Sequence, residues 1–141
     1  MTYYLFQGGA ENLRWWLRPE LADQQWFWSA NKHVKPGDTA FIYLTAPLSR
    51  IIGTVEIFGE PFFHTGGTAF INPHMQEKWC VEVGKREYFG LCEGLTIKEL
   101  RRLFSIDWGW VRYPRGNTRV PDDILLALLE FIEQERQEEK A

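Results

Sequence analysis

Two apolar runs separated by a short turn constrain the fold of this chain more than any other feature. Residues 39–44 (TAFIYL) and 50–58 (RIIGTVEIF) are rich in β-branched and aromatic residues, which favour strands. Lys35-Pro36-Gly37-Asp38 predicts a turn before the first run, and Ala46-Pro47-Leu48-Ser49 predicts one between the two. Gly53, inside the second run, predicts a bulge or a close backbone approach. The runs therefore predict neighbouring strands of a mostly antiparallel sheet.

Further strands are expected on both sides of this pair. Residues 2–6 (TYYLF) predict a first strand, 79–83 (WCVEV) a strand that can continue to Phe89 after a kink at Gly84, and 108–113 (WGWVRY) a last strand. Residues 59–78 contain three glycines and two prolines and predict a long loop, which is a candidate wall of a binding site.

Helical segments are expected in three places. Residues 11–29 mix helix formers with Pro19, so we expect short helical turns there. Thr96 and Glu99 have the spacing of a capping box ahead of a helix of about two turns. Pro121, Asp122 and Asp123 predict the start of a final apolar helix, whose end at 133–141 we expect to be solvated. The pattern predicts an α+β fold with a curled sheet or pseudo-barrel, mostly antiparallel and flanked by short helices.

Length and composition fit one globular domain. The 141 residues are 45% apolar, and no linker or repeat divides them, so residues 1–141 are expected to form a single domain. No apolar run is long enough to span a membrane and the start lacks the pattern of a secretory signal, which predicts a cytoplasmic protein without membrane contact. Cys80 and Cys92 are not spaced as a metal or disulfide motif, and we expect both to be buried thiols.

Aromatic content and a local basic block suggest a binding function. The chain has seven Trp, five Tyr and ten Phe residues, more than a core of this size requires. Its net charge is −3, but residues 98–119 carry six basic and two acidic side chains, with aromatics between the arginines. Arginine pairs with phosphate and aromatic rings stack on bases, so this block is compatible with a local nucleic-acid site. The alternative interpretation is a solvated basic face with buried rings.

The sequence resembles the EVE domain, a member of the PUA-like superfamily that also includes YTH and ASCH domains. The resemblance begins with the first strand and with Trp26 and Trp28. Its most specific part is the pattern G-D-x-x-x-x-Y-x-T, formed by Gly37, Asp38, Tyr43 and Thr45. The later matching stretches are the strand RIIGTVEIF, the pair Pro61-Phe62, KWCVEV, LTIKELRRL and RGNTRVPDDILLALLEFI. It implies a pseudo-barrel whose cleft receives one nucleobase, often modified, and RNA or modified DNA as the partner. The family commonly has an aspartate after the Pro-aromatic pair, but this sequence lacks it and has His64 near that position. The closing arginine motif also differs from that of the family.

The resemblance and the residues together give a set of expected contacts. Trp26 or Trp28, Tyr43 with Thr45, and Phe62 or Phe63 would match the family's base-contacting positions, and Arg115 would lie near its closing arginine. We therefore expect a non-enzymatic module that recognises a modified or flipped base. Its expected base contacts are Trp26, Trp28, Tyr43, Thr45 and Phe63, and its expected phosphate contacts are Arg50, Arg112 and Arg115.

Two other functions fit the same sequence. ASCH relatives include hydrolases of modified nucleosides, and Lys32, Lys35, Asp38, Thr45 and Glu56 are residue types that such chemistry uses, but no spacing places a base beside a nucleophile. Exposed tryptophans would also suit a protein-interaction module, in which the rings lie on a flat face. The histidines and cysteines show no paired ligand spacing, and no phosphate-loop or dinucleotide motif occurs, so no metal, cofactor or catalytic residue is predicted.

Overall fold

The computed structural model describes residues 2–18, 20, 26–64 and 78–140. The strands in this part of the chain are β1 (Tyr3–Gly8), β2 (Trp26–Ser29), β3 (Thr39–Leu44), β4 (Arg50–Ile57), β5 (Phe62–Phe63), β6 (Trp79–Tyr88) and β7 (Thr118–Arg119). The helices are α1 (Leu13–Leu17), α2 (Ile97–Phe104) and α3 (Asp122–Lys140), with 3-10 turns η1 (Ala10–Asn12), η4 (Glu93–Leu95) and η5 (Gly109–Val111).

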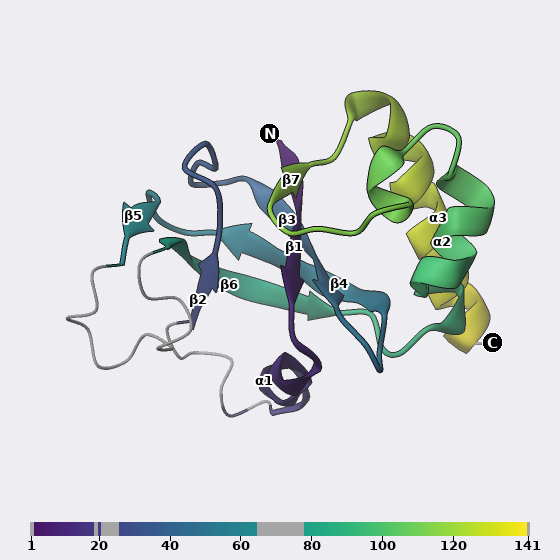
Figure 1. The fold of residues 1–141 in the computed structure, drawn as a ribbon. Coiled ribbons are helices and arrows are strands. Elements are labelled where there is room, and N and C mark those ends of the chain that lie inside the picture. The colour runs from purple at the N-terminus through teal and green to yellow at the C-terminus, as the bar shows by residue number, and fades with distance from the viewer. Residues whose placement is uncertain (1, 19, 21–25, 65–77, 141) are drawn as a thin grey trace.

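The strands form one curled, mixed sheet (Figure 1). Its order is β2-β6-β4-β3-β1-β7, and β5 pairs with the start of β6. Only β1 and β3 pair in parallel, with Tyr3 opposite Thr39, and every other pairing between the named strands is antiparallel. The register shifts between Ile42 and Tyr43 and again between Thr54 and Glu56, and such bulges bend strands. The expected α+β class and mostly antiparallel sheet are confirmed.

Side chains of successive residues alternate between two apolar clusters, one on each face of the sheet. Phe6, Ile42 and Ile52 point into the first cluster, which α1 covers with Trp15 and Trp16. The residues that adjoin them in the sequence point into the second cluster, which α2, η5 and α3 cover. Figure 1 shows α2 and α3 packed together at one end of the molecule, away from β2 and β5.

Several predicted elements agree with the structure. The run at 39–44 is β3 with the predicted bounds, the run at 50–58 is β4, and the strand that opens at Trp79 continues as β6 to Tyr88. Asp38 closes the predicted turn, since its backbone N–H donates to the Lys35 carbonyl and its carboxylate accepts the Lys35 N–H. Both cysteines are buried, as expected.

One predicted element is wrong, and another is correct only in part. The segment 108–113 is not a strand, because Trp108, Trp110 and Val111 all turn into the second cluster and an extended chain would put neighbours on opposite faces. The 3-10 turn η5 occupies this place, and the closing strand is the short β7 further along. The segment 11–29 contains the expected short helical turns, but it ends in β2, which pairs with β6 from Trp26 to Ser29.

The long loop predicted at 59–78 contains the short strand β5, and its residues 65–77 lie outside the described part of the chain. No helix among the described residues is both long and apolar enough to cross a membrane.

Candidate nucleic-acid interface

The structure places Trp28 and Tyr43 on opposite faces of the sheet. Trp28 is 2% exposed in the first apolar cluster, whereas Tyr43 is 5% exposed in the second and meets the Trp110 ring edge-on at 5.1 Å. Burial is the main cause of the raised pKa of Tyr43, and a hydrogen bond with Ser49 and the charge of Arg101 act in the opposite direction. The two rings are therefore not brought together, and each packs inside its own cluster.

Trp28 joins β2 to the end of β1. Its indole N–H donates to the Gln7 carbonyl oxygen at 3.3 Å. The ring also occupies the space beside Gly8, where a Cβ atom would collide with it. A residue without a side chain at position 8 is thus required for Trp28 to pack against the strand end.

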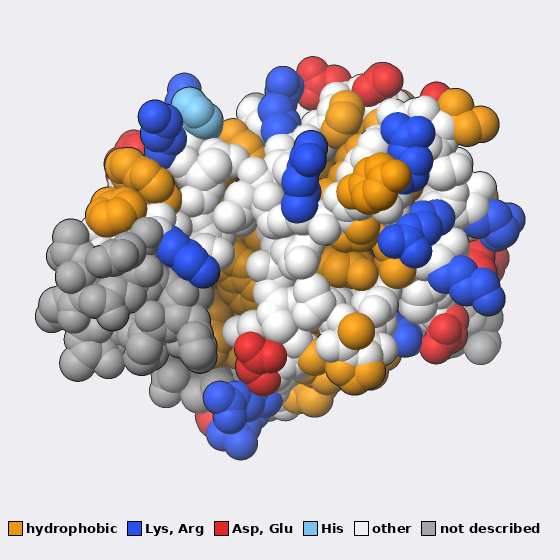
Figure 2. Space-filling model, viewed as in Figure 1, with side chains coloured by type: hydrophobic (Ala, Val, Ile, Leu, Met, Phe, Trp, Pro, Cys, Tyr) orange, Lys and Arg blue, Asp and Glu red, His pale blue; other side chains and the backbone are white. Residues whose placement is uncertain are grey.

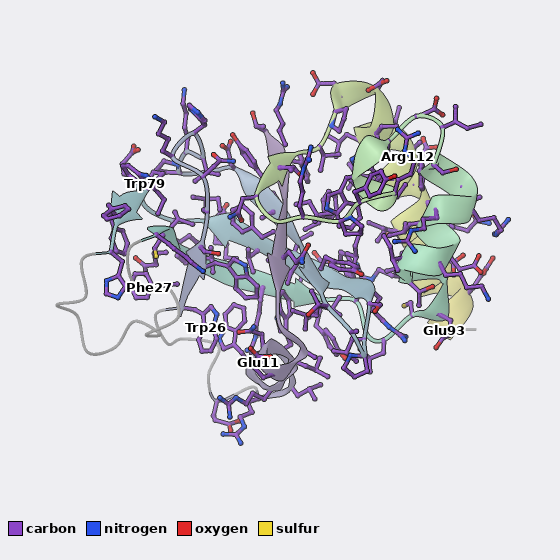
Figure 3. All side chains as sticks on the ribbon, in the orientation of Figure 1. Glu11, Trp26, Phe27, Trp79, Glu93 and Arg112 are labelled. Atoms are coloured by element: carbon purple, nitrogen blue, oxygen red, sulfur yellow. The ribbon has the colours of Figure 1, made fainter. Side chains whose placement is uncertain are left out.

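Trp26 has one ring face covered by another indole. It is half-buried, and its ring stacks on that of Trp15 with centroids 4.7 Å apart and planes 11° apart. The Arg86 guanidinium lies 5.2 Å from the centroid of the Trp15 ring, within the range of a cation–π contact. Figure 3 shows Trp26 on the side of the molecule where α1 and Glu11 lie. A base can stack on Trp26 only from the face that Trp15 leaves open.

Thr45 and Arg50 hold the turn between β3 and β4. Thr45 donates its backbone N–H to Gly8, and its carbonyl oxygen accepts N–H groups of the turn itself. The Arg50 side chain is 14% exposed and donates to the carbonyl oxygens of Leu48 and Leu91 and to the Glu93 carboxylate. The Arg50 guanidinium is therefore used within the protein, which leaves it less able to bind a phosphate.

The arginines of the basic block differ in how far they are engaged. Arg101 donates to the Val111 carbonyl, Arg102 pairs with Glu99 at 3.0 Å, and Arg119 pairs with Asp122 at 3.1 Å. In the described structure, the side chains of Arg112 and Arg115 are exposed and take part in no salt bridge. The Trp110 indole donates to the Arg115 carbonyl at 2.8 Å and so fixes the backbone there.

Four aromatic residues form what we call the β5–β6 aromatic edge: Phe27, Phe62, Phe63 and Trp79. Phe63 is 47% exposed and Trp79 is 40% exposed, although both are large apolar rings. They are opposite each other in the β5–β6 pairing and meet edge-on at 5.9 Å, and Phe27 meets Phe62 edge-on at 5.8 Å. Figure 3 shows Phe27 and Trp79 at the end of the sheet farthest from α3.

Basic side chains lie next to this edge. Figure 2 shows hydrophobic side chains gathered at the β5 end of the molecule, with Lys, Arg and His side chains beside them. Exposed rings beside cations form the combination that binds single-stranded nucleic acid, where bases stack and phosphates pair with the charges. Sequence reasoning identified Phe63 but not Trp79. The available signal was the position of Trp79 as the first residue of its strand after a polar loop.

Two of the residues considered for catalysis, Asp38 and Glu56, are engaged in structural contacts. Asp38 is 8% exposed and accepts backbone N–H groups from Thr2 and Lys35 at 3.1 and 3.0 Å. Glu56 pairs with Lys85 at 3.4 Å. Across residues 2–18, 20, 26–64 and 78–140, no group of three or more His, Cys, Asp or Glu side chains could hold a metal ion. A cavity at the start of β1 and another beside the C-terminal half of α3 contain no predicted base-contacting residue in their linings.

Comparison with known proteins relates this chain to solved structures. No protein-family model matches the sequence, and no curated protein matches it. A protein of Pseudomonas putida superposes with a TM-score of 0.66 at 14% identity, covering 92% of this chain and 99% of that one. The ASCH protein of Zymomonas mobilis superposes with a TM-score of 0.62 at 12% identity, covering 92% and 94%.

A third similar structure contains nucleic acid. Human THYN1 in complex with DNA that contains 5-methylcytosine superposes with a TM-score of 0.58 at 12% identity, covering 94% of this chain and 98% of that one. The TM-scores establish a shared fold, and at sequence identities this low the likeness extends to the fold alone. The curled sheet and its three helices therefore give this chain the α+β, PUA-like fold that it shares with the ASCH protein and THYN1.

Proposed function

We propose that this protein binds nucleic acid and holds one base, modified or turned out of its strand, against the β5–β6 aromatic edge. The observation that carries the proposal is the exposure of Phe63 and Trp79, two large rings in contact with each other on a surface flanked by cations. An apolar ring face that remains in water is favourable for stacking with a base, because every base has a π face.

The similar fold of THYN1 supports this proposal. That protein is in complex with DNA containing 5-methylcytosine, and its fold matches nearly the whole of this chain. A methyl group adds apolar surface to a base, so a site built from aromatic rings favours the modified base over the unmodified one. We propose DNA or RNA with a methylated base as the ligand class.

Roles for the other predicted contacts follow from their positions. Trp26 is proposed to stack on a base through the ring face that Trp15 does not cover, and the exposed Arg112 and Arg115 are proposed to contact phosphates further along the same strand. Trp28, Tyr43 and Arg50 are proposed to act indirectly, by fixing the strands that carry the exposed groups.

The experiment is a titration of the full chain with short single-stranded DNA and RNA, each with and without methylated cytosine or adenine. Fluorescence anisotropy of a labelled oligonucleotide reports the affinity, and intrinsic tryptophan fluorescence reports stacking. Trp79→Ala and Phe63→Ala are each expected to cost about 1–3 kcal/mol, which is roughly 5- to 150-fold in Kd. Leu126→Ala is the control, because it also removes an exposed apolar side chain but lies on α3.

Three outcomes would contradict parts of the proposal. If no oligonucleotide binds at low salt, the protein does not have this function. If Trp79→Ala and Phe63→Ala bind as tightly as the unaltered protein, the base lies elsewhere. If the protein hydrolyses a free methylated nucleoside in a separate incubation followed by chromatography, it is a hydrolase and the binding proposal is wrong as stated.

A further inference from the structure

A cavity of about 440 Å³ opens near the beginning of β1, apart from every residue assigned above. Its volume is within the range of small-molecule sites. Its walls come from the start of β1, from the connection between β2 and β3, from Glu60 just before β5, and from β7. The side chains that give it chemical character are those of Tyr4, Lys32, His33, Lys35, Glu60 and Arg119.

Lysine and arginine side chains outnumber carboxylates in the lining of this cavity. Lys32, Lys35 and Arg119 line it together with His33, and its carboxylates are those of Asp38 and Glu60. Both oxygens of Asp38 already accept backbone N–H groups, so this carboxylate is charged but engaged within the fold. Arg119 also pairs with Asp122 at 3.1 Å, so the two lysines are the less engaged cations of the lining. Within the described part of the chain, neither lysine takes part in a salt bridge.

The segment that carries these cations is held in place. The Tyr4 hydroxyl donates to the His33 carbonyl oxygen at 3.3 Å, and the His33 N–H donates to the Asn31 side chain at 2.8 Å. The Asn31 amide in turn donates to the Asn117 carbonyl at 2.8 Å, and Val34 is 1% exposed. A fixed backbone lowers the entropy that a ligand must remove when several cations close on it.

Burial, with a smaller effect from Asp38, raises the pKa of Tyr4. Its hydroxyl therefore keeps the proton that it donates to His33. Tyr4 is a positioning residue for the cavity wall, since its bond holds the backbone beside Lys32 and Lys35.

We infer that this cavity binds a phosphate group, with Lys32, Lys35 and Arg119 pairing with its oxygens. A phosphate carries several acceptor oxygens and at least one full negative charge, so it can satisfy three cations at once. A cationic ligand would meet three positive side chains and a single uncommitted carboxylate. The inference goes beyond the proposed function, because the phosphate can belong to an oligonucleotide or to a small molecule.

The position of the cavity makes an oligonucleotide a reasonable source. Glu60 lies in its wall, and Phe62 and Phe63 of the β5–β6 aromatic edge follow two and three residues later in the chain. Three residues of chain span at most about 11 Å, so a strand whose base stacks on Phe63 can reach the cavity wall at Glu60 with a neighbouring phosphate.

The test is isothermal titration calorimetry of the full chain with three probes: inorganic phosphate, a short single-stranded oligonucleotide, and the same oligonucleotide with a 5′-phosphate. The double variant Lys32→Gln, Lys35→Gln removes two exposed cations without changing the apolar clusters. The double variant Arg14→Gln, Lys98→Gln is the matched control, because it removes the same charge from exposed positions elsewhere that take part in no salt bridge of the described structure. Thermal unfolding of each variant verifies that the fold is retained.

The expected result is a loss of at least roughly tenfold in affinity for the phosphate-bearing probe with the cavity variant, because two charge-assisted hydrogen bonds are removed. The control variant is expected to show only the smaller change that long-range charge produces. Binding of inorganic phosphate identifies a small-molecule source, and binding of the oligonucleotides alone identifies a strand as the source.

The inference and the proposed function fail in different ways. If the oligonucleotides bind and the cavity variant binds every probe as tightly as the unaltered protein, the cavity is not a phosphate site and the proposed function stands. If inorganic phosphate binds in the cavity and no oligonucleotide binds, the phosphate site stands and the proposed function is wrong. Absence of binding by every probe overturns both.

Discussion

At the scale of single residues, Gly53 shows how closely the strands approach. A Cβ atom at this position would meet the carbonyl oxygen of Glu87 on β6 and the ring of Trp16 from α1. Backbone cannot move aside as a flexible side chain can, so Gly53→Ala is expected to destabilise the protein by about 1–3 kcal/mol. Urea unfolding measures this loss. Gly59→Ala is the control, because a Cβ there meets nothing within 4 Å, and equal stability of the two variants would contradict the close approach.

Tyr43 gives a second residue-scale prediction, concerning pH. Burial raises its pKa above the value of 10.0 for an ordinary tyrosine, so the folded state holds the proton more tightly than the unfolded chain does. The resulting stability is present below pH 10 and is lost as the pH rises through the folded pKa.

Between about pH 9 and about pH 11, the unaltered protein is therefore expected to lose more unfolding free energy than Tyr43→Phe does. Urea unfolding across this range checks the difference. Tyr113→Phe is the control, because it removes a hydroxyl from an exposed ring. Parallel curves for the unaltered protein and Tyr43→Phe would show that Tyr43 does not contribute.

At the scale of elements, the local sequence around Thr96 was largely sufficient to predict where α2 begins. The predicted N-cap is present: the Thr96 hydroxyl accepts the Glu99 N–H at 3.4 Å and donates to the Glu93 carbonyl at 2.9 Å. In a full capping box, the Glu99 carboxylate would also accept the Thr96 N–H. Here the Thr96 N–H donates to the Glu93 carbonyl instead, and the Glu99 carboxylate pairs with Arg102. Neighbouring groups compete for the same atoms, which sequence spacing does not reveal.

Thr96→Ala is expected to cost about 1 kcal/mol of unfolding free energy, since both hydroxyl bonds disappear. Thr96→Ser keeps a hydroxyl that can make both, so it should retain most of the stability in the same urea unfolding experiment. If the alanine and serine variants unfold alike, the cap contributes nothing.

The elements that were predicted wrongly depended on distant contacts. Strand composition predicted 108–113 as extended. The ring centroids of Trp108 and Trp110 instead lie 5.0 Å apart inside one cluster, and this arrangement requires a turn. Trp26 to Ser29 followed a helical, proline-containing stretch, and only pairing with β6 makes it a strand. Turns and periodic runs are local and were predictable, whereas these segments take their conformation from partners far along the chain.

At the scale of the whole molecule, the net charge is negative although one surface segment carries exposed arginines. The net charge is −3, yet the exposed Arg112 and Arg115 lie on the connection between η5 and β7. If each contacts one phosphate, Arg112→Gln or Arg115→Gln should weaken binding to all sequences about equally and lower the salt slope by about 1. Affinities at several salt concentrations measure the slope, with Arg14→Gln on α1 as the control. A sequence-selective loss would instead indicate a base contact.

The sequence could predict which kinds of side chain form the candidate site better than it could predict which residues they are. Aromatic and arginine content indicated rings and cations, but which rings remain exposed depends on the complete packing. Trp28 and Tyr43 are buried because strand alternation sends them into different clusters, and Phe63 and Trp79 are exposed because they pair at the edge of β6. Identifying exposed rings requires the sheet order, which no local pattern in the sequence contains.

The neighbours of β1 have a consequence for how the chain folds during synthesis. β1 emerges from the ribosome before its parallel partner β3, and its other neighbour, β7, follows only at residues 118–119. Until then one edge of β1 has unsatisfied hydrogen-bonding groups, and such edges can pair with other chains. During synthesis, Tyr4 and Leu5 therefore stay open to pairing on this side until residue 119 has been translated.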